Sequence, residues 1–126
     1  MKKSIMIVGT RTYEDYKAFK KQVDEWLNYN VNLNEDIIEI VSGGARGVDS
    51  LAERLANEEN FLLKIFPADW NKYGKSAGPI RNRQMVEYIK EKDGTCLIFW
   101  DGQSKGTKND IDLCKEYGVR YKIFDI

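Results

Sequence analysis

The sequence predicts an α/β protein, a three-layer α/β/α sandwich around a parallel five-stranded sheet. Five short apolar segments alternate with four segments in which apolar residues recur every three or four positions. Most of the short segments are apolar without interruption, which is typical of parallel strands covered by helices on both faces. The chain has 126 residues, the size of one domain, so we expect residues 1–126 to form a single domain.

The first half of the chain contains three of the expected strands, at residues 4–8, 37–41 and 61–66. Thr12 is expected to cap the helix after the first strand, because Asp15 follows three residues later in a variant of the capping box. The two helices between these strands have clear apolar faces. These faces are formed by Tyr16, Phe19, Val23, Trp26 and Leu27 in the first helix and by Val48, Leu51, Ala52, Leu55 and Ala56 in the second.

A loop at residues 67–78 is expected between the third strand and the third helix. Loops of about a dozen residues in small domains are more often functional than accidental. Pro79 fits the first position of the third helix, which we expect to end near Glu91.

The last strands and helix follow from similar signals. Residues 95–100 form another continuous apolar strand. Thr107 is expected to cap the fourth helix, with Asp110 three residues later and Gly118 at its end. Residues 119–124 alternate apolar and charged side chains, which indicates an edge strand.

Composition and charge exclude several classes of function. Lys and Arg number 20, as do Asp and Glu, so the net charge is zero and a generic nucleic-acid binder, which needs a basic surface, is disfavoured. The absence of histidine excludes His-based zinc sites and Ser-His or Cys-His nucleophile pairs. Cys96 and Cys114 lie in apolar stretches and are expected to be buried free thiols.

No apolar run is long enough to span a bilayer. The start of the chain resembles a signal peptide, but its apolar part ends early, at Gly9, and is interpreted as the first strand. We therefore expect a cytoplasmic protein with no membrane partner, and neither a metal nor a cofactor is expected.

Three loops carry the unusual residues. In open parallel sheets, ligands bind beyond the carboxyl ends of the strands, where the strand order reverses. The loops after the first, second and fourth strands are Gly9–Thr12, Ser42–Asp49 and Asp101–Thr107. The last two are rich in glycine and lead directly into helices, an arrangement that lets backbone N–H groups approach an anion. Neither matches the dinucleotide or P-loop fingerprint, and glycines in such turns also serve tight geometry alone.

Basic residues stand where helices begin, although the positive end of a helix favours acidic ones. These residues are Arg11, Arg46, Arg81, Arg83 and Lys105. A bound phosphate would offset their charge, and arginine suits it through bidentate hydrogen bonds. Solvated surface positions are the alternative for each of them.

Aromatic residues accompany these loops. Trp70 and Tyr73 lie in the 67–78 loop and Trp100 ends the fourth strand, so each is a candidate for stacking on a nucleobase. For Trp100, packing beneath a helix is the alternative.

Four segments in this order resemble the YspA-like branch of the SLOG superfamily, which is named for the SMF/DprA proteins and the LOG phosphoribohydrolases. They are the stretches 41–49, 68–70, 78–85 and 104–107. The resemblance spans essentially the whole chain. It implies a Rossmann-like fold that binds nucleotides or nucleotide-derived signals.

The residues and the resemblance together lead to our main hypothesis, a sensor or sequestering protein. Its ligand would be ADP-ribose, an NAD-derived molecule or a cyclic nucleotide, and self-association as a homo-dimer or higher homo-oligomer is implied by the resemblance. The predicted ligand-binding residues are Gly9, Thr10, Arg11, Ser42, Gly43, Gly44, Arg46, Gly47, Asp49, Trp70, Tyr73, Gly78, Arg81, Asn82, Asp101, Ser104, Lys105, Gly106 and Thr107.

Two other functions remain open. The resemblance to LOG enzymes implies hydrolysis of nucleoside 5′-monophosphates, with Asp110 and Arg81 as the catalytic pair. The Pro-Gly-Gly of those enzymes is absent here, and Asp110 stands in place of their glutamate. A purely structural position in a capping box is the alternative for Asp110. Single-stranded DNA binding, as in DprA, is the third hypothesis, against which the zero net charge counts.

Overall fold

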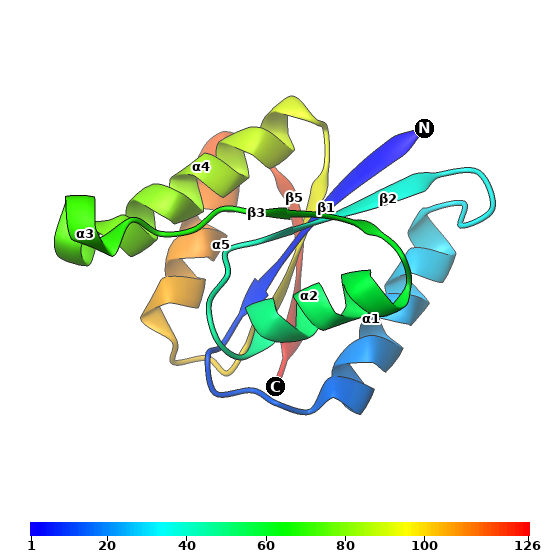
Figure 1. Ribbon diagram of the computed structural model, residues 1–126, viewed down its shortest axis with the longest axis horizontal. Helices are drawn as coiled ribbons and strands as arrows, with labels where there is room; N and C mark the ends of the chain where they lie inside the picture. Colours follow the sequence, from blue (N-terminus) through cyan, green and yellow to red (C-terminus); the bar gives the residue numbers. More distant parts are fainter.

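Five parallel strands form a single sheet in the order β3-β2-β1-β4-β5, in a computed structural model that describes residues 1–126 (Figure 1). The strands are β1 (Lys2–Gly9), β2 (Ile37–Ser42), β3 (Leu62–Ile65), β4 (Thr95–Trp100) and β5 (Arg120–Asp125). The predicted α/β class and parallel sheet are confirmed. The alternating strand β5 lies at one edge, as its pattern predicts, and β3 lies at the other.

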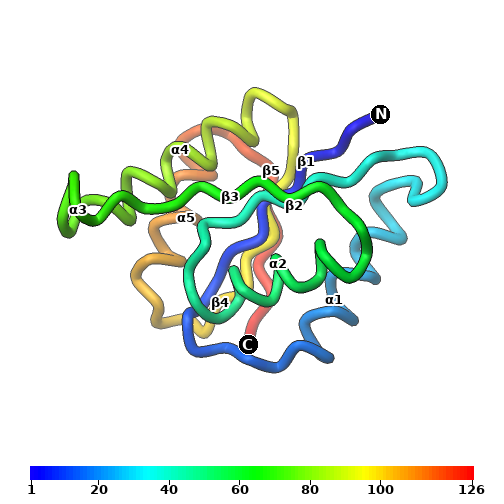
Figure 2. The backbone as a smooth tube through the Cα atoms, in the orientation of Figure 1, coloured from blue at the N-terminus to red at the C-terminus, as the bar shows by residue number.

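Two layers of helices cover the sheet. Helices α1 (Tyr16–Asn30) and α2 (Val48–Glu58) lie on one side, and α4 (Ala77–Glu91) and α5 (Lys105–Tyr117) on the other (Figures 1 and 2). Because successive strand residues point to opposite faces, β1 contributes to both cores. Its Ile5 and Ile7 belong to the cluster beneath α1 and α2, and the intervening Met6 packs against α4 and α5.

Two predicted helix caps are wrong. Asp15, not Thr12, caps α1 by accepting a hydrogen bond from the Ala18 N–H at 3.1 Å. Ser104, not Thr107, caps α5 by accepting from the Thr107 N–H at 3.4 Å. Both segments contain two good capping residues three positions apart, and only the path of the connecting loop decides between them.

The predicted 67–78 loop contains structure. It holds a short helix, α3 (Trp70–Tyr73), a 3₁₀ turn, η1 (Gly74–Ser76), and the first two residues of α4. Pro79 is therefore the third residue of α4, not the first. That position tolerates proline because the first N–H groups of a helix have no intrahelical partner. Helix α3 projects from the body of the molecule (Figure 1).

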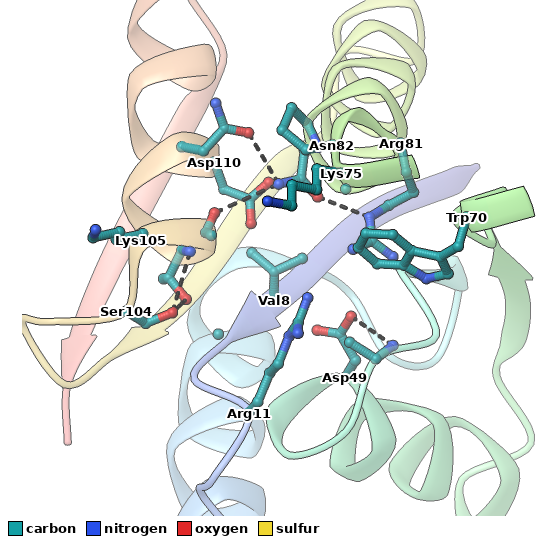
Figure 3. A pocket seen from close by; sticks show the side chains of 17 residues that line it. Val8, Arg11, Asp49, Trp70, Lys75, Arg81, Asn82, Ser104, Lys105 and Asp110 are labelled. Atoms are coloured by element: carbon teal, nitrogen blue, oxygen red, sulfur yellow. Dashed lines mark hydrogen bonds between the residues drawn. The ribbon is translucent and has the colours of Figure 1, made fainter. Parts of the chain in front are cut away.

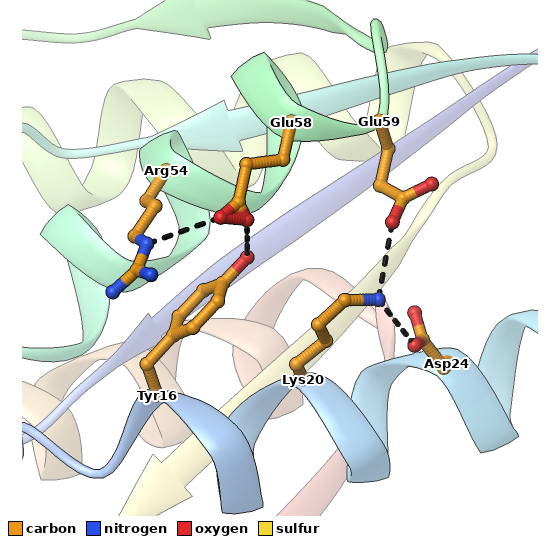
Figure 4. A network of polar contacts seen from close by, with 6 residues as sticks. All are labelled: Tyr16, Lys20, Asp24, Arg54, Glu58 and Glu59. Atoms are coloured by element: carbon orange, nitrogen blue, oxygen red, sulfur yellow. Dashed lines mark hydrogen bonds and ion pairs between the residues drawn. The ribbon is translucent and has the colours of Figure 1, made fainter.

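Polar side chains join α1 to α2 on the surface (Figure 4). The Tyr16 hydroxyl donates to Glu58 at 2.7 Å, and Arg54 donates to the same carboxylate at 3.2 Å. Lys20 bridges Asp24 and Glu59. These exposed contacts fix the pairing of two helices but contribute little free energy each.

A buried polar cluster lies in the sheet, toward its amino-terminal end. The Glu39 carboxylate accepts from the Ser4 hydroxyl at 2.7 Å, the Tyr88 hydroxyl at 2.8 Å and the Lys2 ammonium at 3.0 Å. Burial alone would raise the pKa of Glu39, but these hydrogen bonds outweigh it and lower the pKa. The cluster therefore stabilises the ionised carboxylate.

Cys96 and Cys114 are buried free thiols, as predicted. None of the helices combines the length and the apolar character needed to cross a bilayer.

Candidate functional site

The strand order reverses between β1 and β4, so the chain leaves these neighbouring strands in opposite directions. The loops that follow them are joined there: the Asp101 N–H donates to the Thr10 hydroxyl at 3.2 Å. A cavity of about 500 Å³, the first cavity, opens at this point. Its walls come from the end of β1, the turn after β2, the start of α2, Trp70 and Lys75, and the first turns of α4 and α5 (Figure 3).

A second cavity of about 460 Å³ adjoins the first. It lies between the turn after β2, helix α2 and the segment from β3 to α3. Arg11, Ala45, Trp70 and Arg81 line both cavities and form the partition between them. Each volume falls within the range of about 300–1,000 Å³ found for small-molecule sites.

Arg81 is the buried centre of this partition. It is only 7% exposed, and one terminal nitrogen donates to the Gly43 carbonyl while Nε donates to the Asn82 amide oxygen at 2.8 Å. Asn82 in turn donates to Asn109 of α5 at 3.0 Å. Through this chain of bonds, α4 holds the turn after β2 on one side and α5 on the other.

The glycine turn is shaped by close approach. A Cβ on Gly43 would lie 2.8 Å from an Arg81 nitrogen and 2.9 Å from an Asp49 carboxylate oxygen. Gly47 has a positive φ of 72°, and a Cβ there would meet the Thr10 carbonyl oxygen at 2.4 Å. Glycine is required at Gly43 so that Arg81 and Asp49 can close on the backbone, and at Gly47 so that the β1 loop can pack against it.

Asp49 is a buried carboxyl group in the first cavity, 4% exposed. Burial raises its pKa to about 6, although the hydrogen bond from the Ala45 N–H and the charge of Arg81 oppose the rise. At pH 7 the group is therefore mostly ionised, but close to the pH at which it takes up a proton.

Asp110 is the second buried carboxyl group in the same cavity, also 4% exposed. Burial, followed by the negative charge of Asp49, raises its pKa well above the usual range for aspartate. Its Oδ1 atom is buried and has no hydrogen-bond partner. Because Ser104 caps α5, Asp110 lies in the second turn of the helix, so its alternative interpretation as a capping-box residue is wrong. An unpaired buried oxygen of this kind is expected where a ligand supplies the partner.

Cations line the cavities without being neutralised by the protein. Arg11, Lys75 and Lys105 line the first cavity and Arg46 the second, and none of the four forms an ion pair within the chain. Arg11 extends into the first cavity between Asp49 and Ser104 (Figure 3). The first turn of α5, with its free N–H groups, adds a partial positive charge at the same place.

No group of three or more Cys, Asp or Glu side chains is arranged to hold a metal ion. The site is thus a cleft of glycine turns, unpaired cations and two buried carboxyl groups.

Comparison with known proteins identifies the family of this chain. The sequence profile of the YspA, cpYpsA-related SLOG family matches residues 4–73. The Gene 61 protein of Mycobacterium phage D29 is 30% identical over 120 residues, which cover 91% of this chain and 90% of that protein. This chain belongs to the YspA, cpYpsA-related SLOG family. Membership links it, in general terms, to nucleotide-related binding.

A solved structure shows the same fold as this SLOG protein. The C-terminal domain of the PF1911 hydrogenase from Pyrococcus furiosus aligns with a TM-score of 0.53 and 19% sequence identity, over 98% of this chain and 91% of that domain. At this identity the likeness concerns the Rossmann-like fold alone.

The SLOG fold brings most of the predicted ligand residues to one place. Those at the first cavity are Gly9, Arg11, Asp49, Trp70, Gly78, Arg81, Asn82, Ser104, Lys105, Gly106 and Thr107, together with the predicted catalytic Asp110. Those at the second cavity are Gly43, Gly44 and Arg46, besides the shared Arg11, Trp70 and Arg81. Residues far apart in the sequence thus meet at the edge that strand order predicts.

Other predicted residues do not line either cavity. Thr10, Ser42 and Gly47 support the turns from beneath. Tyr73 lies on α3 outside both cavities. The exposed Asp101 carboxylate accepts hydrogen bonds from the Gln103 and Ser104 N–H groups, both at 2.8 Å.

One aromatic and one basic residue singled out in the sequence, Trp100 and Arg83, are instead held by partners within the chain. The Trp100 indole donates to the Ser104 carbonyl at 3.1 Å and packs against the core beneath α4 and α5. Arg83 lies on the outer side of α4, where it pairs with Glu116 at 3.1 Å.

The sequence analysis missed Lys75, Asn109 and Glu53, which all line the cavities. Lys75 lies in the segment interpreted as an open loop, so nothing indicated its direction. Glu53 carried a usable signal, because it follows Asp49 by four residues and therefore shares its helix face.

Proposed function

We propose that this protein binds a nucleotide or nucleotide-derived molecule, such as ADP-ribose, an NAD-derived signal or a cyclic nucleotide, and acts as a sensor or sequestering protein. One observation carries the proposal. Unpaired cations converge on a cavity at the reversal of strand order, although the chain as a whole has no net charge. A phosphate-bearing ligand is the chemistry that such an arrangement favours.

The parts of a nucleotide have matching positions. The phosphate belongs at the first turn of α5, with Arg11 and Lys75 close by. Sugar hydroxyls belong over Asp110, whose unpaired oxygen accepts or whose protonated form donates a hydrogen bond. The half-exposed indole of Trp70 offers a flat surface to a base.

The first test is a ligand panel with pure protein, covering nucleoside monophosphates, NAD, ADP-ribose, cyclic ADP-ribose isomers and cyclic dinucleotides. Bound and free fractions are separated and analysed by mass spectrometry. We expect at least one intact nucleotide in the protein fraction. Absence of binding and of any thermal shift across the panel would overturn the proposal.

Arg11→Gln is the matched variant, because Arg11 is exposed and has no partner whose loss would affect folding. Loss of a charged hydrogen bond to phosphate weakens binding about ten- to hundredfold. Arg83→Gln removes the same charge outside both cavities and is the control. Equal affinities for the two variants would exclude Arg11 from the phosphate site.

A second candidate function rests on the two buried carboxyl groups. Burial raises the pKa of both groups, to about 6 for Asp49 and well above the usual range for Asp110, and two carboxyl groups with different pKa values suit hydrolysis of a glycosidic bond. In a nucleoside 5′-monophosphate, Asp110 would donate a proton to the departing base as its bond to the sugar breaks. Asp49 would accept a proton from the water that attacks the sugar carbon, and Arg81 would hold the intervening turn.

Free base is the readout for this second function. If the protein is a hydrolase, free base appears with wild-type protein and is abolished by Asp110→Asn, while ligand binding persists. An intact nucleotide recovered without any free base would leave binding as the function and exclude hydrolysis.

A further inference from the structure

The second cavity differs in chemistry from the first. One wall is apolar, formed by Ile65, Pro67, Ala68 and the indole of Trp70. Glu53 on α2 also lines this cavity. Helix α2 thus presents Asp49 to the first cavity and Glu53, one turn later, to the second.

The Glu53 side chain is held in place by one hydrogen bond, but one of its carboxylate oxygens has no partner in the chain. Its Oε2 atom accepts a hydrogen bond from the Ser42 hydroxyl at 2.9 Å, and no cation of the chain pairs with it. Ser42 is fully buried, so this bond holds the Glu53 side chain in place. Its Oε1 atom accepts no hydrogen bond within the chain and is left to accept one from a ligand.

Phosphate does not suit this cavity. The negative charge of Glu53 opposes an anion here. Of the three arginines that line this cavity, Arg11 and Arg81 are shared with the first cavity, so only Arg46 belongs to it alone. An apolar wall together with a fixed acceptor suits a flat, uncharged ring with N–H groups on its edge. A nucleobase with an amino or imino group has this combination.

We propose that the second cavity is the base-recognition half of the site, and that the Glu53 carboxylate accepts hydrogen bonds from N–H groups of the base. The inference rests on the proposed binding function. It also gives the orientation of the ligand. The phosphate lies in the first cavity, and the base lies in the second cavity, between α2 and α3. Arg11 and Arg81, which belong to the partition, flank the sugar and its phosphate.

Matched ligands test the assignment. Isothermal titration calorimetry compares ribose 5-phosphate, purine riboside 5′-monophosphate, AMP, GMP and ADP-ribose. The first has no base, and the second has the purine ring without the amino group. We expect the ring to increase affinity over ribose 5-phosphate, and the N–H groups of AMP and GMP to increase it again.

Glu53→Gln is the matched variant, since the amide can still accept from Ser42. We expect it to weaken the binding of AMP, GMP and ADP-ribose about five- to tenfold, as a charge-assisted hydrogen bond becomes a neutral one. Binding of ribose 5-phosphate stays unchanged. Glu87→Gln, on the exposed side of α4 and outside both cavities, is the control and is expected to behave as wild type.

The outcomes separate the two proposals. If wild-type protein binds none of these ligands, the proposed function fails, and the inference fails with it. If nucleotides bind but Glu53→Gln weakens ribose 5-phosphate and the nucleotides equally, or weakens none of them, the binding function stands and the base assignment is wrong. Thermal unfolding of the variant checks that its fold is intact.

Discussion

At the scale of single residues, two side chains of the first cavity lie where burial disfavours their negative charge. Asp49 and Asp110 are buried carboxyl groups in one cavity, and burial raises the pKa of each. Glu39, equally buried, has a lowered pKa because three donors surround it. Three hydrogen-bond donors therefore satisfy the carboxylate in the sheet, whereas Asp49 accepts one from the Ala45 N–H and Asp110 Oδ1 accepts none.

The raised pKa of Asp49 predicts an unusual pH dependence of stability. Between about pH 4 and pH 6 the unfolded chain has lost this proton while the folded protein keeps it, so stability falls as the pH rises. A shift from 3.8 to about 6 corresponds to roughly 3 kcal/mol. We expect wild type to lose most of that, about 2.4 kcal/mol, relative to Asp49→Asn between pH 4 and pH 7, measured by urea denaturation.

Asp110 is present in both proteins, and because the charge of Asp49 contributes to the raised pKa of Asp110, part of the difference between wild type and Asp49→Asn reflects the interaction of the two carboxyl groups. Asp125→Asn, at an exposed position without an ion pair, is the control and is expected to follow wild type at every pH. A difference between wild type and Asp49→Asn that does not change with pH would show that the carboxyl group has an ordinary pKa.

At the scale of elements, one substitution at the start of α5 is expected to change stability and ligand affinity in opposite directions. A Cβ on Gly106 would have no atom within 4 Å, because the position faces the open cavity. Gly106→Ala is therefore expected to stabilise the protein by about 0.4–1 kcal/mol through the lower entropy of the unfolded chain. The same methyl group stands where phosphate would approach the helix, so binding is expected to weaken.

Denaturation and calorimetry on Gly106→Ala measure these two effects separately. A more stable protein with lower affinity for AMP or ADP-ribose places the phosphate at the start of α5. Unchanged affinity would mean that the phosphate binds elsewhere in the cavity.

Elements also show what sequence reasoning predicts well and where it fails. Continuous apolar strands and amphipathic helices require layers, so the sheet and both cores could be predicted. The caps at Thr12 and Thr107 were misplaced by one turn, because Asp15 and Ser104 are equally good caps and the choice depends on tertiary contacts.

The part of the candidate site that follows from strand order could be predicted from the sequence. Gly43, Arg81 and Asp110 meet because parallel strands end at one edge. The role of Lys75 was not predictable, since it depends on the path of an irregular segment. Self-association is a property that a single chain does not test, and it stays a prediction.

For the whole molecule, the two ends of the sheet carry different groups, the buried Glu39 cluster at the amino-terminal end and the candidate site at the other. Glu39 lies in β2 three residues before Ser42, roughly 10 Å along the strand from the cavities. Its cluster ties β1, β2 and α4 together and lines neither cavity. Effects on folding and on ligand binding should therefore add independently.

Glu39→Gln tests this separation. Removing the charge from a carboxylate with three donors is expected to cost about 1–3 kcal/mol at pH 7. Because the pKa of Glu39 is lowered in the folded protein, this stability is present above the usual pKa of glutamate and is lost as the pH falls through the lowered value.

A ligand at a hundred times its dissociation constant stabilises the folded state by about 2.7 kcal/mol, whatever the stability of the free protein. We expect Glu39→Gln to lower the melting temperature but to keep the full ligand-induced increase, whereas Glu53→Gln keeps the melting temperature and reduces that increase. A reduced ligand effect in Glu39→Gln would mean that the two ends of the sheet are coupled.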